Sequence, residues 1–295
     1  MKKKTLTLLL LSTLLMLVLF PEEAFEGAAD GLLLWFRTVL PTLLPYMILT
    51  NVLMAHVNGH KCRKHQACSA LLGIVCGYPM GAKLCADMVR NRRISAPMGN
   101  FLLPVCNLAG PAFITSYVMT ASLSVQEHRL VCLSCVYMPV VLYAVMSGVW
   151  LHFHASEHDA GEHCVKMNEH ISAPSFDESI MDSFAAITRL GGYIILFALF
   201  SNMLGTLLPN CNGLFFLCLA GLLEITNGIS LVADSTLSHV NQILLSLIIV
   251  NFGGLSCICQ TQSMLHGSGL SIRYYILSKG IIALLTGLMT YVLLC

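Results

Sequence analysis

Long apolar runs recur along the whole chain, and they constrain its fold more than any other feature. A helix of about 20 predominantly apolar residues is long enough to cross the hydrocarbon core of a bilayer. With 56% hydrophobic and only 11% charged residues, the 295-residue chain cannot bury its apolar side chains in a soluble core and keep a wettable surface. The sequence therefore predicts an all-α polytopic membrane protein.

The apolar runs predict where the chain spans the membrane. The expected spans cover residues 5–20, 32–57, 98–121, 130–152, 183–208, 242–265 and 274–295. The first follows three lysines and is either a signal anchor or a cleavable signal peptide, and both readings place the amino terminus in the cytoplasm. Because no convincing A-x-A cleavage site follows, we expect a retained anchor. The second contains Pro41 and Pro45, so we expect it to be kinked and partly unwound.

Two further apolar segments predict re-entrant hairpins, which enter and leave the membrane on one side. Residues 67–83 carry basic residues on both flanks, and Gly77–Gly81 has the turn chemistry of a hairpin tip. On a continuous helix, Gly73, Gly77 and Gly81 would instead form a close-packing stripe, but Pro79 favours the tip. The second hairpin, residues 213–234, centres on Glu224–Gly228.

The basic residues agree with this topology. It places fourteen of the sixteen lysines and arginines on the cytoplasmic side, Lys83 and Lys279 among them, and leaves Arg37 and Arg129 outside. Such an asymmetry follows the positive-inside rule. The near-neutral net charge of +1 gives no indication of a nucleic-acid partner.

The two halves of the chain resemble each other. At an offset of 147 residues, Gly81 and Asp87 fall on Gly228 and Asp234, and at an offset of 144 residues Asn107, Gly110 and Arg129 fall on Asn251, Gly254 and Arg273. Each repeat would hold a kinked span, a hairpin and two further spans, and this odd number of crossings inverts the second copy. We therefore expect an amino-terminal anchor and loop (1–31), a first repeat (32–152), a polar linker (153–182) and a second, inverted repeat (183–295).

Inverted repeats with interrupted helices are typical of secondary transporters, whose substrate site lies where the interruptions meet. A helix that stops inside the bilayer leaves backbone amides and carbonyls that only protein, water, an ion or a polar ligand can satisfy. The candidate substrate-binding residues lie at the hairpin tips and on the spans that follow: Gly77, Pro79, Gly81, Asn107, Gly110 and Pro111 in the first half, and Glu224, Thr226, Asn227, Gly228, Asn251, Gly253, Gly254, Ser256 and Gln260 in the second.

Several of these candidates have a simpler alternative. Glu224 is either a costly intramembrane carboxylate, which should pair with another group, bind a proton or sodium ion, or contact substrate, or it is a solvated loop residue. Asn107 and Asn251 either bind a ligand or form ordinary hydrogen bonds between helices. The histidine-rich stretch 152–182, the group His60, Cys62, His65 and Cys68, and the Cys132–Cys135 pair match no compact metal or redox site. We expect no metal and no cofactor, and leave open a coupling proton or sodium ion.

Four motifs carry a family resemblance: GYPMGAK at 77–83, CNLAGPAFI at 106–114, EITNG at 224–228 and FGGLS at 252–256. Together with residues 34–46, they resemble the sporulation integral membrane proteins known as YlbJ or SpoVV, within the nucleoside-recognition or Gate domain superfamily. The resemblance covers roughly residues 30–290. It implies a transporter that moves dipicolinic acid towards the forespore, related in its gating elements to nucleoside transporters. Lys83 then becomes a candidate counter-charge for the dicarboxylate.

The expected function is therefore alternating-access transport of a small polar or anionic solute in the membrane of a spore-forming bacterium, with the outer forespore membrane as one location. The expected partners are the lipid bilayer and the solute, and a homo-oligomer is left open. The alternatives are a nucleoside transporter and a non-transporting component of spore-envelope assembly. An enzyme is not expected, because the chain has neither H-E-x-x-H nor G-x-S-x-G.

Overall fold

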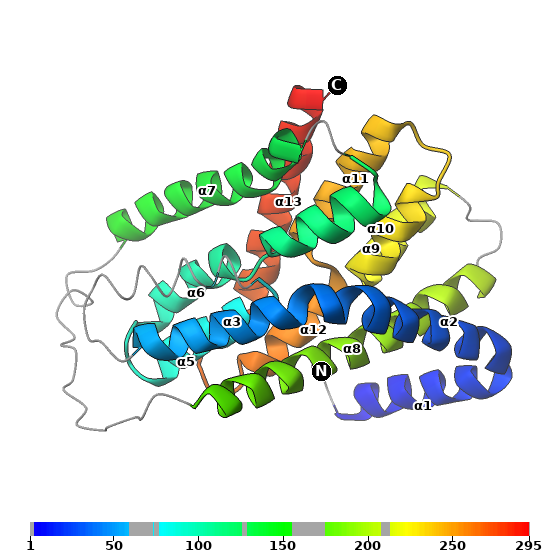
Figure 1. The fold of residues 1–295 in the computed structure, drawn as a ribbon, viewed down its shortest axis with the longest axis horizontal. Helices are drawn as coiled ribbons and strands as arrows, with labels where there is room; N and C mark the ends of the chain where they lie inside the picture. Colours follow the sequence, from blue (N-terminus) through cyan, green and yellow to red (C-terminus); the bar gives the residue numbers. More distant parts are fainter. Residues whose placement is uncertain are drawn as a thin grey trace.

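The computed structural model describes residues 3–58, 73, 77–125, 129–154, 175–207 and 213–294, and in these residues every regular element is helical. The helices of the first half are α1 (Lys3–Leu19), α2 (Pro21–Leu34), η1 (Trp35–Val39), α3 (Leu40–Asn58), α5 (Met80–Arg90), α6 (Ala96–Cys106), η2 (Phe113–Ser122) and α7 (Arg129–His154). Those of the second half are α8 (Phe176–Leu207), α9 (Leu214–Leu223), α10 (Ile225–Ala233), α11 (His239–Phe252), α12 (Gly254–Met264) and α13 (Ile272–Leu294). Figure 1 shows their arrangement.

Five stretches in the described part of the chain are long and apolar enough to span a membrane: Pro21–Leu53, Arg129–Val149, Phe176–Leu207, His239–Met264 and Ile272–Leu294. They coincide with five of the seven expected spans, which confirms an all-α membrane protein. The expected span 98–121 is divided into α6 and η2. The expected span 5–20 corresponds to α1, whose 17 residues are fewer than the roughly 20 that cross a bilayer. The first arm of the hairpin at 67–83, apart from Gly73, and most of the linker lie outside the described residues.

The expected loop before residue 32 is instead helical. Pro21 begins α2 at a position where its missing N–H costs nothing, and Glu22 and Glu23 lie in the first turn, where negative charge complements the helix dipole. The helix then continues through η1 into α3, which contains Pro45. We expected unwinding here, but the chain forms the π-helical turn η1 just before Pro41. Such a turn shifts the hydrogen-bond register, so a residue without an N–H is accommodated in a continuous helix.

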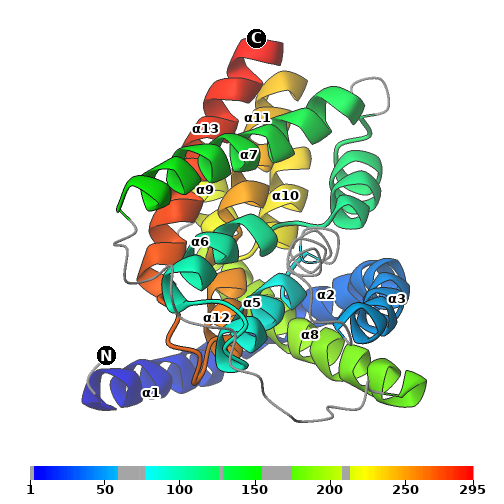
Figure 2. The same ribbon diagram turned by 90° about the vertical axis from the view of Figure 1, so that its left-hand side faces the viewer.

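The continuous helix α2–η1–α3 lies along α8, as both ribbon views show (Figures 1 and 2). A Cβ atom added to Gly27 would lie 2.8 Å from the Leu199 Cα atom, and one added to Gly31 would lie 2.9 Å from the Ile195 Cα atom. Close approach through small residues four apart is a common way for membrane helices to pack. The GxxxG spacing of Gly27 and Gly31 was a signal that our sequence analysis missed.

Helix α1 packs against α2 and α8, and the other helices form a second group, in which α11 packs against α13 and α7 lies beside both (Figure 2). Its largest buried cluster joins side chains of η2, α7, α10, α11 and α12. Cys132 and Cys135 are free, buried members of this cluster, so they pack as small apolar groups.

The elements after α3 and those after α8 follow in the same order. In each series a short helix begins at an interruption, a longer helix is broken in the middle, and an unbroken helix ends the series. The interruptions lie at Gly77–Pro79 and Asn107–Gly110 in the first series, and at Glu224 and Gly253 in the second. Backbone that leaves the helix at these four places needs partners other than its own turns.

Candidate functional site

The first interruption, Gly77–Pro79, packs against the break that separates α6 from η2. The backbone N–H of Tyr78 donates to the carbonyl of Leu108 at 2.9 Å, and the N–H of Ala82 donates to the Asn107 side-chain oxygen at 3.2 Å. Gly77 has φ +70°, and a Cβ atom there would lie 2.6 Å from the Gly110 nitrogen. The tip and the break therefore form one unit, which we call the first junction.

The second interruption consists of Glu224, between α9 and α10. Its carboxylate accepts from the Asn227 backbone N–H at 2.8 Å and from the Thr226 hydroxyl, and so caps α10. The Tyr117 hydroxyl donates to the carbonyl of Thr226 at 2.7 Å. Glu224 is only 2% exposed, so the solvated-loop alternative is wrong.

This second tip packs on the break between α11 and α12. A Cβ atom on Gly254, which has φ +64°, would lie 3.1 Å from the carbonyl oxygen of Gly221. A Cβ atom on Gly228 would overlap the Gly221 backbone. Glu224, Gly228 and the Gly253–Gly254 break therefore form a second junction. It touches the first one, because a Cβ atom on Gly253 would lie 2.5 Å from the Tyr78 hydroxyl.

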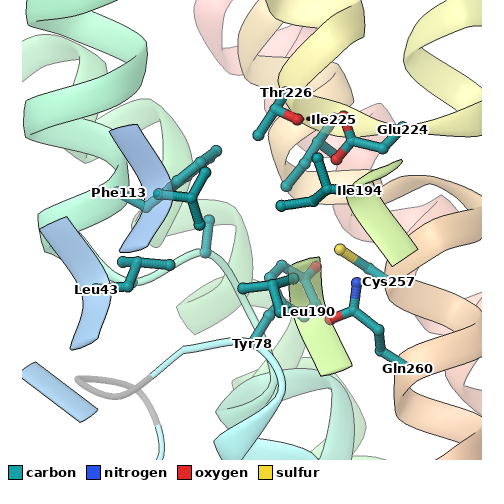
Figure 3. A pocket seen from close by; sticks show the side chains of 13 residues that line it. Leu43, Tyr78, Phe113, Leu190, Ile194, Glu224, Ile225, Thr226, Cys257 and Gln260 are labelled. Atoms are coloured by element: carbon teal, nitrogen blue, oxygen red, sulfur yellow. Dashed lines mark hydrogen bonds between the residues drawn. The ribbon is translucent and has the colours of Figure 1, made fainter. Parts of the chain in front are cut away.

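A cavity with about 460 Å³ of empty space, its open mouth included, lies between the two junctions. Figure 3 shows Glu224 and Thr226 at one end and Tyr78 and Gln260 at the other. Apolar side chains line the space between these ends. The full lining is Val39, Leu43, Tyr78, Ala109, Gly110, Phe113, Leu190, Ile194, Glu224, Ile225, Thr226, Cys257 and Gln260.

Four of the candidate residues from the sequence line this cavity: Gly110, Glu224, Thr226 and Gln260. Gly77, Pro79 and Gly81 are buried behind it, and a Cβ atom on Gly81 would overlap the carbonyl of Cys106. Pro111 and Asn227 are half-buried beside the junctions, while Ser256 is buried and accepts from the Gln260 amide at 3.1 Å.

The two candidate asparagines bond to other helices. The Asn107 amide donates to the Thr261 hydroxyl at 2.8 Å and to the Tyr275 hydroxyl at 3.0 Å. The Asn251 amide donates to the carbonyl of Val136 at 3.0 Å and to the Thr286 hydroxyl at 2.5 Å. Both are fully buried and lie outside the cavity lining, so their contacts here are those of packing between helices.

Lys83 also lies outside the cavity lining. Its ammonium forms an ion pair with Asp182 at 3.2 Å, and the two side chains are 38% and 62% exposed. The pair joins α5 to α8. The charge of Lys83 therefore already has a partner in this structure.

Sequence reasoning missed Lys279, which it counted among the cytoplasmic charges. Lys279 is fully buried on α13, and its Nζ atom lies 5.2 Å from the centre of the Tyr78 ring. Helical spacing was the signal that could have found it. The helical spacing places Lys279 on the same face of α13 as three other buried residues. These are Tyr275, four residues before it, Ile282, three residues after it, and Thr286, seven residues after it.

Within the described ranges, no three His, Cys, Asp or Glu side chains come close enough to hold a metal ion. The group His60, Cys62, His65 and Cys68 lies outside those ranges. The polar groups of the cavity are instead one carboxylate, one hydroxyl and one amide, together with the Tyr78 phenol. Such a set suits a small solute with polar groups at both ends of an apolar body.

Comparisons with known proteins agree with the membrane assignment. No family model matches the chain, and no solved structure does. The chain is similar to the protein named "Sporulation integral membrane protein YlbJ" of Bacillus subtilis (strain 168), with 22% identity over 319 aligned positions. The alignment covers 88% of this chain and 74% of that protein. It supports the YlbJ-like part of the resemblance, and with the five candidate spans it makes this chain an integral membrane protein distantly homologous to a sporulation protein.

Proposed function

We propose that this protein is a secondary transporter that moves a small polar or anionic solute across the membrane by alternating access. The observation that carries the proposal is the cavity itself, because both junctions contribute its polar groups. Interrupted helices that meet around a cavity are the arrangement that such transporters use for substrate binding.

The cavity lining also supports the inverted repeat. At the offset of 147 residues, Leu43 and Tyr78 fall on Leu190 and Ile225, and at the offset of 144 residues Phe113 falls on Cys257. All six of these side chains line the cavity. Two inverted repeats, 32–152 and 183–295, would thus present matching positions to one solute from opposite sides. The segments on either side of Gly77–Pro79 and Glu224 would be the re-entrant hairpins.

Dipicolinate is the first solute to test. Tyr78 and Phe113, with the aliphatic side chains around them, give the cavity the apolar lining against which an aromatic ring packs, and polar groups lie at both ends. The name of the Bacillus subtilis relative refers to sporulation, and we extend that role to this chain, in a membrane of a spore-forming cell.

Glu224 would couple transport to a cation. A carboxylate that is 2% exposed at this depth is costly unless a proton, a sodium ion or a partner balances its charge. Its described hydrogen bonds come from neutral groups, the Thr226 hydroxyl and the Asn227 amide. Glu224 would therefore take up and release the coupling cation as the solute crosses.

The test is reconstitution of the purified protein into liposomes, with labelled dipicolinate and a panel of labelled nucleosides. We expect dipicolinate uptake that responds to a proton or sodium gradient. Glu224→Gln should lower the rate about tenfold or more and abolish the response to the gradient. The matched control is Glu26→Gln, which removes an exposed carboxylate from α2 and should change neither.

The outcomes separate the candidate functions. Uptake of nucleosides without dipicolinate would identify a nucleoside transporter. If the folded wild-type protein carried no solute of the panel, transport would be rejected in favour of a non-transporting role in spore-envelope assembly. Equal rates for wild type and Glu224→Gln would remove Glu224 from the coupling mechanism.

A further inference from the structure

Lys279 is a buried cation for which the proposed function has so far given no role. Its side chain is fully buried, and its Nζ atom makes no hydrogen bond to any described residue. The Nζ atom lies 5.2 Å from the centre of the Tyr78 ring, and the face of an aromatic ring attracts a cation only modestly. A charge in this condition is costly for folding, so its retention needs a reason.

The described neighbours of Lys279 carry no formal negative charge. The Tyr78 hydroxyl lies near that of Tyr275, and Tyr275 in turn bonds to Asn107. Ser278, the preceding residue on α13, bonds to Tyr143. Glu224 lies at the opposite end of the cavity from Tyr78, where it caps α10 (Figure 3). The surroundings of Lys279 therefore leave its positive charge uncompensated.

Tyr78 connects Lys279 to the cavity. The Tyr78 side chain lines the cavity, and the Lys279 ammonium lies over its ring. Beside Tyr78 in Figure 3, the Gln260 side chain also lines this end, and it is only 3% exposed. Its Oε1 atom has no hydrogen-bond partner among the described residues. Cys257 lies on α12, as Gln260 does, and it is close enough to Lys279 and to Glu224 to be affected by the charge of each. This end of the cavity thus has a buried cation behind it and an unsatisfied amide beside it.

We propose that Lys279 selects for anions: a carboxylate of the solute binds at the Tyr78–Gln260 end of the cavity, with the Lys279 ammonium as its counter-charge. The Gln260 amide donates to the same carboxylate after rotation by half a turn, which exchanges its nitrogen and oxygen. The apolar body of the solute packs against Phe113 and Leu43. This inference rests on the proposed function and deepens it, since it assigns the charge recognition to Lys279 in place of Lys83, which is paired with Asp182.

Lys279→Met tests the proposal, because methionine keeps most of the volume of the side chain and removes its charge. The probes are dipicolinate and its uncharged diamide, each used for uptake into liposomes and for thermal unfolding of the purified protein. In the wild type, dipicolinate should raise the melting temperature and the diamide should not. Lys279→Met should abolish the dipicolinate-induced shift and lower dipicolinate uptake about tenfold or more.

The unfolding of the unliganded variant separates a binding role from a packing role. Removal of a buried charge that has no partner should raise the melting temperature by about 2 °C or more. The matched control is Arg189→Met, which removes one positive charge from the exposed side of α8 and should leave binding and uptake unchanged. Lys279→Arg keeps the charge and should retain part of the dipicolinate-induced shift.

Two results would overturn the proposal while the proposed function stands. One is equal dipicolinate uptake by wild type and Lys279→Met. The other is a lower melting temperature for unliganded Lys279→Met, which would assign the lysine to packing even if uptake were lost. If the wild type neither bound nor carried any solute of the panel, the proposed function would fail first and the role of Lys279 with it.

Discussion

The two junctions are built from matching elements but are held together by different groups. At the first, backbone N–H groups of the tip bond to the break, and Asn107 bridges the tip to α12 and α13. At the second, the Glu224 side chain caps its own helix, and Tyr117 provides the cross-link to η2. The first junction has a buried cation behind its tip, and the second has a carboxylate in its tip.

This difference gives the cavity a direction. If the two junctions were chemically identical, a solute could bind equally well in two opposite orientations. With Glu224 at one end and Lys279 behind the other, a carboxylate of the solute favours the Lys279 end, and a second carboxylate near Glu224 requires a proton or a sodium ion there. Two junctions with the same order of elements can therefore carry an asymmetric site, and the comparison can be tested by changing residues that hold each junction together.

The largest effects are expected at the glycines, and they should not distinguish the junctions. Gly77→Ala forces a side chain into positive φ and onto the Gly110 backbone, and should cost about 3 kcal/mol of stability. Gly228→Ala overlaps the Gly221 backbone and should also cost about 3 kcal/mol. Thermal unfolding in detergent measures both. The control is Gly192→Ala, which has no atom within 4 Å of the new Cβ. If Gly77→Ala had the same melting temperature as Gly192→Ala, the close packing of the first tip would be contradicted.

The glycine positions also show what the sequence could predict. Glycine and proline together provide turn chemistry, and acidic residues are scarce in apolar runs, so Gly77, Pro79, Glu224 and Gly254 marked the interruptions directly. The same runs fixed five of the seven expected spans. These features depend on local chemistry, which a single sequence contains.

What the sequence analysis missed depends on which face of a helix is turned inward. Lys279 counts as a cytoplasmic charge by the positive-inside rule, yet its face of α13 is turned into the protein. Tyr78 and Phe113 were ordinary apolar residues until the fold placed them around one cavity. Conversely, Lys83 has the right charge for an anionic solute but is partly exposed and paired with Asp182. Such placements are properties of packing between distant segments.

The matching asparagines should separate the junctions more clearly than the glycines. Asn107 makes three side-chain hydrogen bonds that join the tip, α12 and α13, whereas the Asn251 amide makes two and its oxygen has no partner in the described part of the chain. Asn107→Ala should therefore cost about 2 kcal/mol and Asn251→Ala about 1 kcal/mol. Asn241→Ala, at an exposed position on α11, is the control for unfolding measurements. Equal losses for Asn107 and Asn251 would mean that the first junction has no extra stabilisation from its amide.

One tyrosine hydroxyl bonds to a carbonyl at each junction, and removing it should have a smaller effect. Tyr117 donates to Thr226 at 2.7 Å, and Tyr137 donates to Ala109 at 3.1 Å. Tyr117→Phe should cost about 1 kcal/mol and Tyr137→Phe about half of that, because the first junction keeps its backbone bonds. Hydrogen exchange should accordingly quicken at residues 225–228 in Tyr117→Phe more than at residues 108–110 in Tyr137→Phe. The opposite order would make the first tip the more weakly held one.

The smallest effect is expected for Lys83, which sharpens the comparison between a paired and an unpaired lysine. Its ion pair with Asp182 is exposed, and such pairs contribute about 0.5 kcal/mol or less. Lys83→Met and Asp182→Asn should each leave the melting temperature nearly unchanged, and the double variant should match the single ones. Dipicolinate uptake by Lys83→Met should change less than about twofold, because the Lys83 charge is partly exposed and already paired with Asp182. A large loss of uptake in Lys83→Met, without one in Asp182→Asn, would return the counter-charge to Lys83 and would leave the buried ammonium of Lys279 without a transport role.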